Sequence, residues 1–223
     1  MGNWITVTAE DNHACHAWLA KPDGAPKGVV VVMQEIFGVN DHIRRDTDKF
    51  AKRGYVAIAP AVFDRVEADV ELDYDQDGMT KGRAIVDDLG WDGPLMDVQA
   101  AAEAAQAVAD FGGPVFGVGY CWGGSLAWLA STRLAIPSVG YYGGRTAGLA
   151  DEQPKAPMML HFGANDAMIP MDDVNAIGDA HGAVPIHVYN AGHGFNCAAR
   201  ADFDQTAADL ALRRTLSFFD ALV

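Results

Sequence analysis

The chain of 223 residues carries a formal charge of −14 at pH 7, and half of its residues are hydrophobic. This length and hydrophobic content suffice for one sizeable core, so we expect a single α/β domain over residues 1–223. A surface this acidic repels nucleic acid and anionic membranes, and neither is expected as a partner.

The N-terminus lacks a basic region followed by an apolar stretch, so no signal peptide is expected. No apolar run approaches the length of a membrane span. The three cysteines, Cys15, Cys121 and Cys197, form an odd and sparse set that does not suggest a disulfide framework. They fit a reducing cytoplasm, and we expect a cytoplasmic monomer that acts on a small molecule.

The first sixty residues predict strands and one helix. Four strands are expected in this part, at residues 3–9, 13–20, 28–33 and 55–59. The strands at residues 3–9 and 13–20 are predicted to pair as a hairpin. The run 28–33 is apolar throughout, which is typical of a central parallel strand buried on both faces. Asn40 caps a predicted helix that ends before Gly54.

Residues 61–93 interrupt this rhythm, because they are rich in Asp and Glu and show little apolar periodicity. A segment of this length between a strand and a helix is more often a functional lid than a loop without a function. The pattern Asp-x-Asp-x-Asp-Gly over residues 73–78 matches the opening of an EF-hand loop, but Ala84 stands where calcium binding needs glutamate. A solvated acidic loop is therefore the favoured interpretation.

His13, Cys15 and His16 are close enough in sequence to suggest metal ligands. In a strand, however, His13 and His16 point to opposite faces, and no further ligand cluster is apparent. We therefore expect no metal, and no cofactor is expected either.

From residue 94 onward, helices and strands alternate. Strands are predicted at residues 114–118, 136–142, 157–162 and 184–189, and helices at 97–109, 125–130, 171–181 and 202–221. Alternation from residue 28 to the end predicts a doubly wound, mostly parallel sheet with helices on both faces.

Cys121 lies between a predicted strand and a predicted helix, in the pattern Gly-x-Cys-x-Gly. This is the nucleophile-elbow pattern with Cys in place of Ser. The nucleophile of such an elbow sits in a strained turn, in which Gly119 and Gly123 approach closely and must lack a Cβ. The start of the following helix favours a thiolate and an oxyanion. The alternative is a buried structural cysteine in a glycine-rich turn.

Three candidate residues, Cys121, Asp166 and His193, each follow a predicted strand. The carboxyl ends of parallel strands meet at one edge of a sheet, so we expect these side chains to converge. Their order along the chain is that of the α/β-hydrolases. An adjacent imidazole can convert the thiol to a thiolate, and the acid holds the imidazole in the required tautomer. The backbone N–H groups of Trp122 and Ile36 are the expected oxyanion-hole donors.

Four segments together resemble the dienelactone hydrolase (carboxymethylenebutenolidase) family of the α/β-hydrolase superfamily. They are residues 34–38, 119–124, 163–166 and 192–195, in order and over nearly the whole chain. The resemblance implies an α/β-hydrolase fold, a Cys121–His193–Asp166 triad and a role in aromatic degradation. It further implies that Glu35 pairs with the resting thiol until substrate displaces it, and that Phe37 lines the substrate pocket.

The sequence departs from the family pattern in its arginines. Archetypal members hold the substrate carboxylate with two arginines, one of them shortly after the catalytic histidine. Here the first arginine after His193 is Arg200, and Arg83 is the candidate for the other. The resemblance therefore supports the catalytic residues more strongly than it supports the family's substrate.

We expect Cys121 to attack the carbonyl of a dienelactone-like lactone or ester, and His193 to activate water against the resulting acyl-enzyme. A non-catalytic ligand-binding or redox-sensing protein on the same scaffold is the alternative, and it predicts no turnover. An acyltransferase would use the same three residues.

Overall fold

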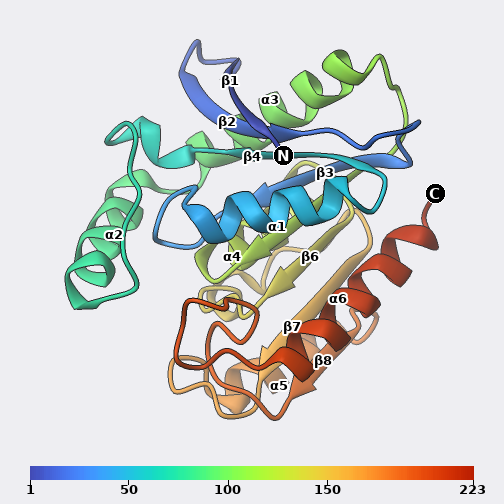
Figure 1. The fold of residues 1–223 in the computed structure, drawn as a ribbon. Helices are drawn as coiled ribbons and strands as arrows, with labels where there is room; N and C mark the ends of the chain where they lie inside the picture. Colours follow the sequence, from blue (N-terminus) through green and yellow to red (C-terminus); the bar gives the residue numbers. More distant parts are fainter. The chain divides into compact units, whose positions relative to one another are not determined.

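The computed structural model describes residues 1–223, and the chain divides into two compact units, residues 1–117 and 118–223 (Figure 1). Each unit consists of strands with helices packed against them. None of the helices is both long and apolar enough to cross a membrane.

The strands of the first unit follow the order β1-β2-β4-β3. Their bounds are Asn3–Thr8 for β1, Ala14–Ala20 for β2, Gly28–Met33 for β3 and Tyr55–Pro60 for β4. β1 and β2 form the expected antiparallel hairpin, β2 is antiparallel to β4, and β3 is parallel to β4. Every residue of β3 and β4 is buried, so the prediction of a central strand at residues 28–33 is confirmed.

Two helices of the first unit cover these strands. Helix α1 (Asp41–Ala51) lies in front of them in Figure 1 and α3 (Asp92–Ala109) behind them. The Asn40 side chain accepts hydrogen bonds from the backbone N–H groups of His42 and Ile43. This confirms the predicted cap, which satisfies two N–H groups that would otherwise lack partners.

Residues 61–93 are not the acidic loop that the sequence favoured. They hold a short 3-10 helix, η1 (Val62–Arg65), and the helix α2 (Gln76–Leu89). The Asp75 side chain caps α2 by accepting the Gly78 N–H at 2.8 Å. The aspartates that resembled a calcium loop therefore mark a helix start. The buried face of α2 consists of Gly78, Gly82, Ile85 and Val86. Because two of these residues are glycines, the sequence does not show the regular spacing of apolar side chains that predicts a helix.

The second unit contains three parallel strands in the order β6-β7-β8. They are β6 (Ser138–Tyr141), β7 (Met158–Gly163) and β8 (Ile186–Tyr189), while β5 (Val115–Tyr120) crosses the boundary between the units. The helices are α4 (Trp122–Arg133), the 3-10 helix η2 (Ala147–Leu149), α5 (Met171–Ala180) and α6 (Gln205–Asp220). The predicted alternation of helices and strands is confirmed.

A chain of polar side chains crosses the core of the second unit. Buried His161 on β7 contacts the Tyr189 hydroxyl through Nδ1 at 2.9 Å and the Thr215 hydroxyl through Nε2 at 3.2 Å. Thr215 on α6 also bonds the Tyr141 hydroxyl at 2.7 Å, and Arg214 donates to the Tyr189 hydroxyl at 3.1 Å. Burial lowers the pKa of His161 well below its ordinary value. His161 is thus a satisfied core residue that joins β6, β7, β8 and α6.

Candidate active site

Cys121 stands in a strained turn between β5 and α4. Its φ of 54° and ψ of −121° lie in a region that side-chain-bearing residues rarely adopt. A Cβ at Gly119 would collide with the carbonyl oxygen of Gly123, so the glycines two before and two after Cys121 come as close as the elbow pattern predicts. The Cys121 N–H donates to the Tyr141 carbonyl at 3.0 Å, which anchors the turn to β6.

His193 and Asp166 reach Cys121 from the turns after β8 and β7. His193 Nε2 lies 3.3 Å from Cys121 Sγ, and His193 Nδ1 donates to Asp166 Oδ2 at 2.7 Å. The other oxygen of Asp166 accepts the Met168 and Ile169 N–H groups at 2.8 and 3.2 Å, which orients the carboxylate. All three members are buried. The expected convergence of Cys121, Asp166 and His193 is therefore present within the second unit.

The electrostatics of this group favour a protonated imidazole. Burial disfavours the charged form of His193, but the hydrogen bonds to Asp166 and Cys121 outweigh burial and raise the pKa of His193 to about 10. A positive imidazolium 3.3 Å from Sγ stabilises negative charge on the sulfur. The arrangement is suited to nucleophilic chemistry at Cys121.

Arg200 lies beside the turn that carries His193. Gly194 has a φ of 77°, and a Cβ there would press on the Arg200 side chain. The Arg200 N–H donates to the Cys197 carbonyl at 3.0 Å, which closes the loop after the histidine. The candidate cation is thus adjacent to the triad turn within this unit.

Glu35 follows β3 in the first unit and is fully buried. The Tyr74 hydroxyl donates to Glu35 Oε2 at 2.9 Å, and Asn40 Nδ2 donates to the Tyr74 hydroxyl at 3.1 Å. The Tyr74 ring also packs on Phe37, with ring centroids 4.4 Å apart. Tyr74 belongs to none of the sequence motifs described above. Its only signal was an aromatic residue amid acids in a segment without apolar periodicity.

The segment from Glu35 to Gly38 is held by residues 70–82. Leu72 N–H donates to the Phe37 carbonyl at 3.0 Å, and Gly38 pairs with Glu71 in an isolated β-bridge. Gly82 of α2 approaches the Ile36 carbonyl so closely that a Cβ there would collide with it. Arg83 is exposed on α2, directly after Gly82. The predicted residues Glu35, Ile36, Phe37 and Arg83 thus lie in one locally packed region of this unit.

The comparison with known families agrees with this geometry. Residues 15–223 match the sequence model of the dienelactone hydrolase family. The chain belongs to the dienelactone hydrolase family. It has the α/β-hydrolase fold, as the sequence predicted, and it is a hydrolase of lactones or carboxylic esters.

Relatives of similar length support this membership. The carboxymethylenebutenolidase of Pseudomonas putida is 31% identical over 229 residues, which cover 98% of this chain and 96% of that protein. Carboxymethylenebutenolidase 1 of Cupriavidus pinatubonensis is 30% identical, and the match covers 100% of this chain and 98% of that protein. A Klebsiella pneumoniae structure provisionally named a dienelactone hydrolase superposes with a TM-score of 0.85, at 28% identity and with 99% and 98% of the two chains covered.

Proposed function

We propose that this dienelactone hydrolase family member opens its lactone or ester through a covalent Cys121 acyl-enzyme. The proposal rests on two contacts. Cys121 Sγ lies 3.3 Å from His193 Nε2, and His193 Nδ1 lies 2.7 Å from Asp166 Oδ2. A nucleophile within reach of a base that is itself oriented by an acid is the arrangement that acyl transfer requires.

The reaction proceeds in two halves. The Cys121 thiolate attacks the carbonyl carbon, the tetrahedral adduct collapses, and the leaving oxygen takes the proton held by His193 Nε2. A thioester remains on Cys121, and with a lactone substrate the ring-opened alcohol or enol stays attached to the acyl group. His193 then removes a proton from water, hydroxide attacks the thioester, and the thiolate departs to release the carboxylic acid.

The N–H groups of Trp122 and Ile36 are proposed as donors to the oxyanion. Trp122 is the first residue of α4, immediately after the nucleophile, which is the position that supplies one oxyanion donor in α/β-hydrolases. Ile36 follows Glu35 after β3, in the loop that supplies the second donor in α/β-hydrolases. The Gln34 side-chain amide donates to the Glu35 carbonyl at 3.3 Å, and this carbonyl belongs to the same peptide plane as the Ile36 N–H.

Glu35 is proposed to regulate the thiol, as the family resemblance of residues 34–38 implies. Its burial and its hydrogen bond from Tyr74 support this role, because a buried carboxylate persists only when it is hydrogen-bonded or paired. Phe37 is proposed to line the substrate pocket, and Arg83 and Arg200 to attract a substrate carboxylate. We propose that the two units belong to one hydrolase domain, since the family match runs through both.

The test compares hydrolysis of a dienelactone and of a neutral activated aryl ester by wild type and Cys121→Ala. We expect the substitution to lower kcat/KM by at least about a thousandfold on every substrate that wild type turns over. The matched control is Cys15→Ala, since burial raises the pKa of the Cys15 thiol to about 12 and leaves it unreactive.

A Cys121→Ala protein with wild-type rates would refute the nucleophile assignment. Membership of a hydrolase family does not favour the alternative of a non-catalytic sensor. Adding an alcohol or thiol acceptor and analysing the products separates hydrolysis from acyl transfer.

A further inference from the structure

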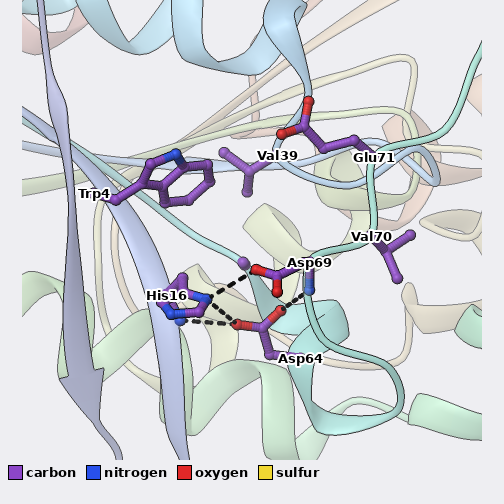
Figure 2. Close-up of a pocket in the computed structure, with 8 residues that line it drawn as sticks. Trp4, His16, Val39, Asp64, Asp69, Val70 and Glu71 are labelled. Atoms are coloured by element: carbon purple, nitrogen blue, oxygen red, sulfur yellow. Dashed lines mark hydrogen bonds and ion pairs between the residues drawn. The ribbon is translucent and has the colours of Figure 1, made fainter.

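A hollow of about 260 Å³ lies in the first unit, and none of its lining residues belongs to the proposed catalytic machinery. Figure 2 shows it between β1 and β2, which contribute Trp4 and His16, and the segment that follows β4, which contributes Asp64, Asp69 and Glu71. A volume of this size suits a small organic molecule rather than a drug-sized one.

One wall of the hollow is apolar. Trp4 exposes 42% of its surface, a large fraction for so large an apolar side chain. Its indole faces the space, and Val39 and Val70 complete the apolar lining (Figure 2). An indole in this position provides both apolar contact area and a π face that attracts cations.

The opposite side is negatively charged. His16 Nδ1 lies 3.4 Å from Asp64 Oδ2 and 3.3 Å from Asp69 Oδ1, both longer than a charge-assisted hydrogen bond. The Asp64 side chain is nearly buried and is held by the N–H groups of His16 and Asp69, at 2.9 and 3.2 Å. The Asp69 carboxylate is 81% exposed and contacts the His16 ring. Two carboxylates therefore face the space, and the side chain between them is His16 rather than a lysine or an arginine.

Arg44 of α1 shows that the lining of the hollow binds a cation. Its guanidinium lies 2.6 Å from the Glu71 carboxylate and 5.9 Å from the Trp4 ring. One cation of the protein thus already sits between carboxylate and indole. Arg44 pairs with Glu71 and Asp41 but not with Asp64 or Asp69, so these two carboxylates keep their side of the hollow negative.

We propose that this hollow binds a small organic ammonium ion. The ammonium group lies beside Asp64 and Asp69, and the apolar body packs against Trp4 and Val39. An anion is repelled by the carboxylates, and a neutral apolar molecule would leave them desolvated without a partner. This site is separate from the proposed hydrolytic site and gives the protein a second class of ligand.

The test titrates the full chain with phenethylammonium chloride in a calorimeter. The neutral 2-phenylethanol and the anionic 3-phenylpropionate serve as probes of similar shape. We expect saturable binding of the ammonium ion alone, and weaker binding at high salt. Binding of the alcohol with equal affinity, or no saturable binding of the amine, would overturn the proposal.

Two variants locate the ligand. Trp4→Leu removes the π face, and Asp69→Asn removes one charge at a position whose φ of 59° suits asparagine. Each should weaken amine binding by about threefold to thirtyfold, with aryl ester hydrolysis unchanged as evidence of an intact fold. Asp88→Asn, an exposed acid of α2, is the matched control. Unchanged affinity in both variants contradicts the proposal, and binding of zinc or manganese in place of the amine would identify a metal site instead.

Discussion

The phenolic hydroxyl of Tyr74 donates a hydrogen bond to the buried carboxylate of Glu35, across 2.9 Å and 39 residues of sequence. Tyr74 precedes α2, and Glu35 lies two residues after the end of β3. The bond therefore joins the acidic segment to the residue proposed to control the nucleophile.

Tyr74→Phe keeps the ring that packs on Phe37 and removes the hydroxyl, which donates to Glu35 and accepts from Asn40. Since a buried carboxylate loses a hydrogen bond, the free energy of unfolding should fall by about 1–3 kcal/mol, measured by urea denaturation. In a double-mutant cycle with Glu35→Ala, the two losses should not add, because each variant removes the hydrogen bond between Tyr74 and Glu35. Additive losses would show that the two side chains act independently.

Gly119→Ala should destabilise the elbow. The new Cβ meets the Gly123 carbonyl, which belongs to the backbone and cannot rotate away. We expect a loss of about 2–4 kcal/mol in unfolding free energy, together with loss of hydrolysis. Gly148→Ala is the control, since nothing lies within 4 Å of a Cβ at Gly148. Equal stability of the two variants would contradict the close approach at the elbow.

His193 should make stability depend on pH. Its folded pKa of about 10 exceeds the ordinary value of 6.5, so the folded state binds more protons than the unfolded state between these values. The stabilisation is complete below pH 6.5 and is lost as pH rises toward 10. Urea unfolding of wild type should therefore show a steeper decline over this window than unfolding of His193→Gln. Parallel curves for the two proteins would exclude an elevated pKa.

Arg200→Ala should discriminate between substrates. If Arg200 attracts a substrate carboxylate, KM for an anionic dienelactone rises roughly tenfold while KM for a neutral aryl ester stays the same. Arg83→Ala is measured in parallel and separates the two candidate cations. A KM increase on both substrates would instead indicate that Arg200 supports the turn around Gly194.

The strand–turn–helix pattern around Cys121 could be read from the sequence because glycine spacing and apolar runs are local signals. The same holds for β3, which coincides with the predicted residues 28–33. α2 could not be read in this way, because two of its four buried residues are glycines that carry no apolar signal. Tyr74 also escaped prediction, since its contact with Glu35 arises only when two distant segments pack together.

The glycines of α2 have a consequence for protein engineering. Gly78 lies against the Asp73 carbonyl and Gly82 against the Ile36 carbonyl, and a side chain at either position would push the helix off the loop beneath it. A library that aims to widen substrate scope should therefore leave both glycines unchanged. Thr80, Lys81 and Arg83 face solvent on the same helix and are the positions to randomise.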